Sequence, residues 1–428
     1  MSELLDRHRQ VMGAGAPLFY DEPLELVRGD GVWLDDAQGR RYLDLYNNVP
    51  CVGHANPRVA GAVAAQVGTL NVHSRYLHDG VVEYAERLVG LHHDGIESLI
   101  LACSGTEALE VAITMARLAT DRRGVIGTDA TYHGNSAVVG RLTALPVGLD
   151  RDGVRSIATP QRYRPLVDGL TDDELCERHL EQLAATIRGL EADGVGLAAL
   201  VLCPILANEG LPEPPAEWFS RATAMVAEAG GLVIADEVQA GFGRSGRWWG
   251  YQTSGIRPDI VCMGKPMGNG LPLSGVAAGH DLVGRFRSTN RYFNTFAASP
   301  LQAAAGMAVI DELVDRELVD RTARVGAHLI DGLRRLQSDH PRMGDVRGHG
   351  LFIGIDWVHP GTTDPDVPGA AAMVESLKER GMLLGKAGQH GNVLKIRPPL
   401  VFDVEHADTF LAAFADAVAD AHRGADHG

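Results

Sequence analysis

Three stretches of the sequence place chemically capable side chains directly after a buried apolar run. LILA (99–102) leads into Cys103 and then Ser104-Gly105-Thr106-Glu107, GLVIA (231–235) into Asp236-Glu237-Val238-Gln239, and DIVCMG (259–264) into Lys265. Short apolar runs bounded by Gly, Pro or Asp are typical of strands buried on both faces of a parallel sheet. Ligands of such sheets bind beyond the carboxyl ends of the strands. We therefore expect these side chains to line one crevice.

The first of these segments has the features of a phosphate-binding helix N-terminus. Ser104 and Glu107 have the S-x-x-E spacing of a capping box, which predicts that a helix begins there. Gly105 permits close approach of the backbone, and Thr106 adds a hydroxyl among free N–H groups at the positive end of the helix dipole. Taken alone, such a segment is more often a plain helix cap.

The other two segments supply an acid pair and a lysine. Asp236 and Glu237 could bind a metal, act as a base or cap the next element, and the pair alone decides nothing. Lys265, at a strand end between Gly264 and Pro266, is expected in the crevice, where a desolvated lysine has a lowered pKa and forms Schiff bases. A structural lysine is the alternative. Together, a phosphate cradle, a buried acid and a strand-end lysine are what pyridoxal 5'-phosphate requires.

Two further motifs are weaker. Residues 241–246, GFGRSG, match the G-x-G-x-x-G dinucleotide pattern, but five residues separate them from their strand and no helix follows, so the required context is missing. His92-His93-Asp94 could suggest a metal site, but a solvated helix end is the more common explanation. We predict no metal.

The elements expected to position these residues form an α/β fold. Residues 1–55 read as short strands with turns, and from about residue 56 helices alternate with short apolar runs, which indicates a mainly parallel sheet. Long amphipathic helices follow residue 300, and a strand-rich piece comes after them. We predict a large cofactor-binding domain at 56–305 and a smaller domain built from both termini, residues 1–55 and 306–428.

Composition excludes several classes of partner. The chain has 428 residues and a net charge of -16, which argues against nucleic acid and anionic membranes. Its five cysteines are scattered singly, and the N-terminus MSELLDRHRQ lacks an apolar signal-peptide core. No run of about 18 apolar residues occurs. We expect a cytoplasmic protein.

Read together, the motifs resemble those of the class III aminotransferases, which are fold type I pyridoxal-phosphate enzymes. SGTEALEVAITMAR, TYHG, ADEVQAGFGRSG, PDIVCMGKPMGNGLP and YFNTF stand in that family's order and spacing, over about residues 20–415. The resemblance implies that Lys265 carries the cofactor and that Asp236 pairs with its ring nitrogen. The other implied contacts are Gln239 at the phenolic oxygen, Val238 and Tyr132 on the two ring faces with His133 beside them, and Gly105, Thr106 and the neighbouring subunit's Thr295 at the phosphate. Family members are dimers with shared sites, so a homodimer or larger assembly is expected.

A subgroup of this family is also similar. Class III enzymes that use glutamate have a Glu-Pro after the strand at 198–202 and a C-terminal arginine, which form a switchable pair; here these positions are Cys203 and Lys395. YLDLYNNV, NVHSRYLHDGVVEYAERL, RGHGLFIGIDWV and NVLKIRPPL resemble the ethanolamine-phosphate and hydroxylysine-phosphate phospho-lyases. Cys203 and the Ala-Ala-Ser at 297–299 depart from that pattern as well.

The resemblance implies elimination of phosphate from an O-phosphorylated amino alcohol such as ethanolamine phosphate, giving an aldehyde, ammonia and phosphate. Lys265 would remove the proton from the amine-bearing carbon. A phosphate dianion needs dedicated cations, and we expect Lys395 and Arg75 to bind it, with Arg397 as a weaker candidate. The first rival is an ω-aminotransferase that uses pyruvate or glyoxylate. The second, a cofactor-binding regulator or scaffold, is disfavoured because Lys265, Asp236 and Gln239 all stand in place.

Overall fold

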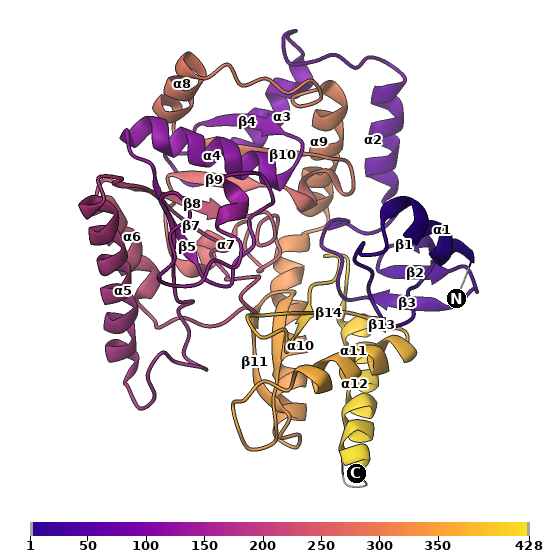
Figure 1. The fold of residues 1–428 in the computed structure, drawn as a ribbon. Helices are drawn as coiled ribbons and strands as arrows, with labels where there is room; N and C mark the ends of the chain where they lie inside the picture. Colours follow the sequence, from indigo (N-terminus) through magenta and orange to yellow (C-terminus); the bar gives the residue numbers. More distant parts are fainter. Residues whose placement is uncertain (1–2, 426–428) are drawn as a thin grey trace.

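A seven-stranded sheet forms the core of the upper part of the molecule as drawn in Figure 1, and its strands are apolar runs of the sequence. The computed structural model describes residues 3–425. The sheet order is β4-β10-β9-β8-β7-β5-β6, and only β10 runs against its neighbours. The strands are β4 Ser98–Ala102, β5 Gly124–Thr128, β6 Val154–Ile157, β7 Leu197–Leu202, β8 Leu232–Asp236, β9 Ile260–Met263 and β10 Ser274–Ala278. The predicted mainly parallel sheet is confirmed.

Helices cover both faces of this sheet (Figure 1), as expected for strands that are apolar on both sides. Consecutive residues of β7 face opposite ways: Leu200 packs in the cluster that contains α5 (Asp172–Ala192) and α6 (Trp218–Glu228). Val201 packs in the cluster with α4 (Gly105–Thr120) and α8 (His280–Thr289). The sheet is therefore held rigid from both sides, and its strand ends are a stable platform for a site.

Two four-stranded sheets adjoin this core. The first has the order β1-β2-β3-β13, with β3 and β13 parallel, so the two ends of the chain share one sheet. The second has the order β11-β12-β15-β14 and is antiparallel. Their strands are β1 Leu26–Asp30, β2 Trp33–Asp36, β3 Arg41–Asp44, β11 Met343–His349, β12 Phe352–Trp357, β13 Met382–Leu383, β14 Gly385–Ala387 and β15 Val393–Ile396. This shared sheet agrees with a smaller unit built from both termini; the boundaries at 55 and 305 stay predictions.

The remaining elements are mostly helical. They are α1 Glu3–Met12, α2 Pro57–Val67, α3 Asp79–Val89, η1 Val139–Arg141, α7 Gly250–Ser254, η2 Lys265–Gly268, α9 Pro300–Asp315, α10 Leu318–Gln337, α11 Val367–Glu379 and α12 Val404–Ala425. The long helices after residue 300 are confirmed. The interpretation of residues 1–55 as strands was wrong at its start, because Glu3–Met12 form the helix α1. This helix buries no residue, so the segment has no core-facing apolar pattern from which its structure could be predicted.

Candidate active site

The three strand-end segments meet at one edge of the sheet, as the sequence predicts. Val238 is the point where they converge. A Cβ added to Gly105 would lie 3.1 Å from Val238, and one added to Gly264 would lie 3.2 Å from Val238 and 3.6 Å from the Gly105 Cα. Both glycines are thus needed for close packing. The segments that follow β4, β8 and β9 therefore surround a common space.

Asp236, the last residue of β8, is oriented by a short chain of buried hydrogen bonds. Its Oδ2 lies 2.6 Å from His133 Nδ1, and its Oδ1 accepts the Val238 N–H at 3.0 Å. His133 Nε2 in turn lies 2.9 Å from the Thr131 hydroxyl. The sequence placed His133 in the site but gave no reason to single out Thr131. This chain fixes the direction of the Asp236 carboxylate.

Glu237 has a different task from its neighbour. It is fully buried, and its two oxygens accept the N–H groups of Gly250 and Tyr251 at 2.8 and 2.7 Å. It therefore fastens the start of α7. Desolvation raises the pKa of Glu237 from 4.5 to about 8. Of the two acids, Asp236 therefore lies beside the site, whereas Glu237 stabilises the fold through the backbone of α7.

The raised pKa of Glu237 predicts a pH-dependent stability. Between pH of about 4.5 and 8 the folded protein binds more protons at this group than the unfolded chain, so stability falls as pH rises through that window. Glu237→Gln should flatten this dependence, whose upper limit is about 1.4 kcal/mol per pH unit. Thermal unfolding at pH 5, 6.5 and 8 measures it. Glu228→Gln, at an exposed position on α6, should keep the wild-type profile. Parallel profiles for wild type and Glu237→Gln would contradict the prediction.

Lys265 begins η2, immediately after β9, and is mostly surrounded by protein. Desolvation lowers the pKa of Lys265, and the nearby Asp236 opposes this shift. A lowered pKa makes the neutral, nucleophilic amine more available. The lysine therefore lies where the sequence placed it, with the electrostatic environment that covalent chemistry requires.

The N-terminus of α4 provides unpaired backbone donors. The Ser104 hydroxyl accepts the Glu107 N–H at 3.1 Å, which is the first half of the predicted capping box. The second half is altered, because the Glu107 carboxylate accepts the Cys103 N–H at 3.0 Å. The first N–H groups of a helix have no intrahelical acceptor, so those of Gly105 and Thr106 are available for an anion. Asn135, whose Oδ1 lies 3.4 Å from the Thr106 hydroxyl, was not foreseen.

Gln239 connects the site to two buried cations on β15 and the residues after it. Lys395 Nζ lies 3.3 Å from Gln239 Oε1 and 2.7 Å from Ala207 O. The Arg397 guanidinium donates to the same Gln239 oxygen and, through Nε, to Tyr46 O at 2.8 Å. Burial lowers the pKa of Lys395 well below its usual range, and the neighbouring Arg397 adds to that effect. Both predicted substrate-binding cations therefore face the site.

Arg75 and Thr295 lie elsewhere on this chain. Arg75 stacks on the Phe293 ring at 4.1 Å, and Thr295 is an exposed residue of the same loop. Glu107 anchors that loop through the Tyr292 hydroxyl at 2.7 Å and Asn294 Nδ2 at 2.8 Å. Within residues 3–425, no recorded hydrogen bond or ion pair joins Arg75 to Lys395. Arg75 thus contacts the loop that carries Thr295 through Phe293.

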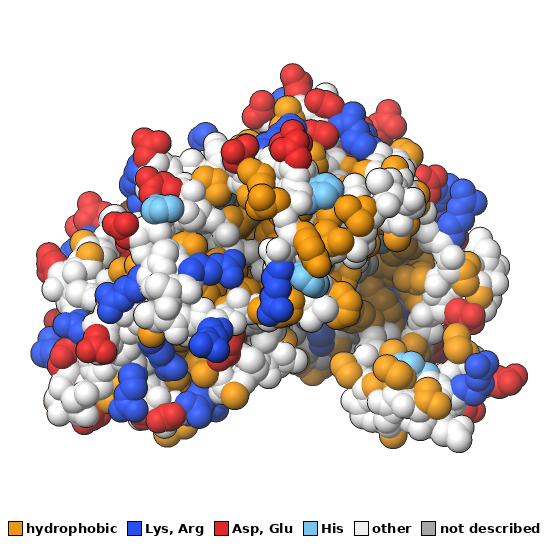
Figure 2. Space-filling view, turned by 90° about the horizontal axis from the view of Figure 1, so that it is seen from above, with side chains coloured by type: hydrophobic (Ala, Val, Ile, Leu, Met, Phe, Trp, Pro, Cys, Tyr) orange, Lys and Arg blue, Asp and Glu red, His pale blue; other side chains and the backbone are white. Residues whose placement is uncertain are grey.

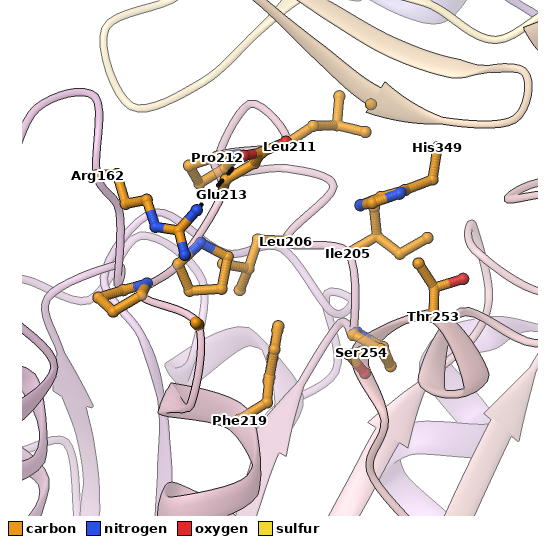
Figure 3. A pocket seen from close by; sticks show the side chains of 15 residues that line it. Arg162, Ile205, Leu206, Leu211, Pro212, Glu213, Phe219, Thr253, Ser254 and His349 are labelled. Atoms are coloured by element: carbon orange, nitrogen blue, oxygen red, sulfur yellow. Dashed lines mark ion pairs between the residues drawn. The ribbon is translucent and has the colours of Figure 1, made fainter. Parts of the chain in front are cut away.

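A cavity of about 290 Å³ lies next to the site and contains none of the candidate site residues (Figure 3). Its walls come from residues that follow β7, among them Ile205, Leu206 and Leu211, and from the polar residues Arg162, Glu213 and His349. An Arg162–Glu213 ion pair of 3.9 Å crosses its rim. The cavity is therefore separate from the chemistry around Lys265.

The two weaker motifs have structural roles. His92 stacks on Trp249 with ring centroids 4.1 Å apart, and within residues 3–425 no group of three potential metal ligands occurs. In the glycine motif, Gly243 and Gly246 occupy positive φ values of 87° and 79°, as turns require. Among the described helices, none is long and apolar enough to cross a membrane.

Comparisons with known proteins agree with this geometry. The model of the family "Aminotransferase class-III" matches residues 19–418. An "Alanine--glyoxylate aminotransferase 2-like" protein of Drosophila melanogaster is 33% identical, covering 97% of this chain and 87% of its own. "Ethanolamine-phosphate phospho-lyase homolog 1" of Caenorhabditis elegans is also 33% identical, covering 94% and 90%.

A solved structure is more similar still. A phospholyase from Arthrobacter, in complex with phosphoethanolamine, superposes with a TM-score of 0.94 at 42% identity, covering 97% of this chain and 99% of that one. The fold, the strand-end lysine and the family match together lead to one conclusion. The chain belongs to the class III aminotransferase family of fold type I enzymes.

Proposed function

We propose that the protein is a pyridoxal-phosphate-dependent phospho-lyase acting on an O-phosphorylated amino alcohol such as ethanolamine phosphate. The residues fit the cofactor. Lys265 is an amine of lowered pKa, Asp236 is a buried and oriented carboxylate, and the α4 N-terminus offers free N–H groups at Gly105 and Thr106. When bound, the cofactor supplies an aldehyde for the amine and a ring that takes up negative charge.

The remaining proposed cofactor contacts stand around this core. Val238 would lie against one ring face and Tyr132 against the other, with His133 behind Asp236. Gln239 would donate to the phenolic oxygen. These roles come from the family resemblance.

The observation that carries the proposal is a pair of buried cations without a carboxylate partner. Lys395 is 3% exposed and Arg397 8%, and within residues 3–425 neither forms an ion pair with Asp or Glu. Buried charges in proteins are normally paired. An ammonium group has three donors and a guanidinium five, so both retain donors beyond those used by Ala207, Tyr46 and Gln239. A phosphate dianion would balance the charge of this pair and accept hydrogen bonds from its remaining donors.

These groups would divide the reaction between them. The Lys265 amine would remove the proton from the carbon that bears the substrate amine. The C–O bond on the adjacent carbon breaks, and its electron pair leaves with the phosphate, which Lys395 and Arg397 hold. Water hydrolyses the released product. For ethanolamine phosphate the balance is substrate plus water giving acetaldehyde, ammonia and phosphate.

The test is incubation of the holoenzyme with ethanolamine phosphate and assay of free phosphate, with and without pyruvate or glyoxylate. We expect one phosphate and one aldehyde per substrate and no effect of the keto acid. Turnover that requires a keto acid and leaves the phosphate ester intact would identify the ω-aminotransferase instead. The Drosophila relative carries the name of an alanine–glyoxylate aminotransferase.

Cys203 explains why glutamate should be a poor substrate. It is buried in an apolar cluster with Ile205, Ala207, Leu211, Ala240 and Phe352, where burial raises the pKa of its thiol. Two members of that cluster also contact Lys395: Ala207 O accepts from its Nζ at 2.7 Å, and the Phe352 ring lies 5.3 Å from the same atom. A thiol here leaves Lys395 free for phosphate. The wild-type enzyme should therefore use glutamate and 2-oxoglutarate weakly.

Cys203→Glu should place a carboxylate beside Lys395 and lower kcat/KM for ethanolamine phosphate by about tenfold or more, as expected for loss of one charge-assisted contact. Cys203→Gln has the same shape without the charge and serves as the matched control. Phosphate-release kinetics measure both. Equal losses in the two variants would show that volume, not charge, matters at this position.

We also propose that two copies of the chain assemble. Hydrophobic side chains gather beside a hollow on one face (Figure 2). Exposed apolar residues near Arg75 and Thr295 include Val67, Leu70, Tyr76, Leu77, Phe293 and Phe296, and Leu77 is 99% exposed. Patches of this kind mark protein interfaces. A second copy would receive Thr295 and Arg75 from this surface at its own site. Sedimentation of the holoenzyme as a monomer would contradict this arrangement.

A further inference from the structure

The loop that follows β7, residues 203–211, has a strained backbone. Leu206 and Leu211 have φ values of 49° and 57°, in the left-handed region that side-chain-bearing residues rarely adopt. Such residues persist only where the surroundings hold them in place, and they cluster at functional sites. The loop between these leucines therefore needs an explanation.

Contacts from three other segments hold the loop in this shape. The Glu209 carboxylate is buried and accepts the Thr128 hydroxyl and the Asn208 N–H, the latter at 3.0 Å. The Arg347 guanidinium donates to Gly210 O at 2.7 Å. The Gly388 N–H donates to Asn208 O at 3.1 Å. Both backbone polar groups of Asn208, its N–H and its carbonyl oxygen, are thus hydrogen-bonded.

The strained conformation separates the two faces of the loop. Leu206 and Leu211 line the cavity of Figure 3, whereas Asn208 extends to the candidate site. Its Oδ1 accepts from Gln239 Nε2 at 2.9 Å, and its Nδ2 donates to Tyr132 O at 2.8 Å. One amide therefore joins the two residues that are proposed to contact the cofactor at its phenolic oxygen and on one ring face.

The direction of the Gln239 amide follows from its partners. Lys395 and Arg397 have only hydrogen-bond donors, so the atom that faces them is the Gln239 oxygen. Its NH₂ group must then face Asn208. One hydrogen of that group is used by Asn208 Oδ1, and the other remains available to an acceptor in the site.

We propose that Asn208 is a positioning residue, which fixes the Gln239 side chain and the Tyr132 backbone in the arrangement that the cofactor requires. The inference rests on the proposed function only in taking Gln239 and Tyr132 as cofactor contacts. It assigns a role to a residue that touches neither the reacting carbon nor the phosphate.

The first measurement uses the substrate-free holoenzyme, so it does not depend on the reaction. Asn208→Ala should keep its cofactor content but lose ellipticity in the visible circular dichroism band of the bound cofactor, because two groups around the ring lose a fixed position. Gln337→Ala is the matched control: Gln337 Nε2 donates to Gly344 O at 3.1 Å, far from the site, so this variant also loses one amide-to-carbonyl hydrogen bond.

The second measurement is a double-mutant cycle with Gln239→Ala. Alone, Asn208→Ala should lower kcat roughly tenfold with KM for ethanolamine phosphate within about twofold, as expected for one or two lost neutral hydrogen bonds that orient a reacting group. In the Gln239→Ala background it should cost at most about threefold, because the two residues act together.

Either of two results would overturn the inference: unchanged ellipticity in Asn208→Ala, or an equal cost in both backgrounds. A wild-type enzyme that releases no phosphate would instead refute the proposed function and leave the ellipticity comparison valid.

Discussion

Lys265→Ala is expected to lower kcat for phosphate release by at least about 10²–10⁴-fold, the range for loss of a positioned acid–base group. The side chain lies after β9 with a lowered pKa and beside Asp236. Gly264, which precedes Lys265, packs against Gly105 at the N-terminus of α4. Lys265 therefore lies close to the proposed phosphate-binding end of that helix. In the proposed function, removing this lysine would take away the covalent attachment of the cofactor and the base for the carbon-bound proton in one change.

Two measurements separate these roles. Borohydride reduction of the wild-type holoenzyme should fix a pyridoxyl mass on the peptide that contains Lys265, and the variant should show no such mass. Lys386→Ala, at an exposed position on β14, removes a lysine outside the site and should behave as wild type. Turnover by Lys265→Ala near the wild-type rate would make the mechanism wrong.

How far the sequence predicts this site depends on where each residue stands. Lys265, Asp236 and Gly105 lie at or just after the ends of apolar runs that are typical of buried strands, and parallel strands bring their carboxyl ends to one edge. To predict that these three residues lie close together, it was enough to know that their strands run in the same direction. Their convergence on Val238 confirms it.

Other parts of the site have no local pattern. Asn208 contacts Gln239 across 31 positions and Tyr132 across 76, and its loop has neither helical nor strand periodicity. The strained leucines on either side gave no warning, because leucine is not a turn residue. Thr131 and Asn135 were missed for the same reason: their roles arise from tertiary contacts alone.

The family resemblance supplied what periodicity could not, and the structure refines it. Lys395 and Arg397 face the site, as expected, but both also bind Gln239. Arg75, named beside Lys395 as a phosphate ligand, instead stacks on Phe293 at an exposed surface. Its role as a ligand therefore stays a prediction that requires a second copy of the chain.

Lys395→Met is expected to lower kcat/KM for ethanolamine phosphate by about ten- to a hundredfold, since charge-assisted hydrogen bonds contribute roughly 1.5–3 kcal/mol each. Methionine keeps most of the buried volume beside Phe352, whose ring lies 5.3 Å from the Nζ. Cofactor content should stay intact, because Lys265 and the α4 N-terminus hold the cofactor in the proposed site. Arg397→Met should have a similar effect.

Charge can be separated from shape by the pH dependence. Burial lowers the pKa of Lys395, so the free enzyme loses this cation as pH rises, and kcat/KM should fall on the alkaline side earlier than an ordinary lysine would cause. Lys395→Arg keeps a cation that does not titrate in this pH range. The variant should still bind phosphate, and its kcat/KM should no longer fall at alkaline pH because of a charge lost at position 395. A Lys395→Met, Arg75→Met double variant with full cofactor occupancy and wild-type phosphate release would show that these cations do not bind the substrate.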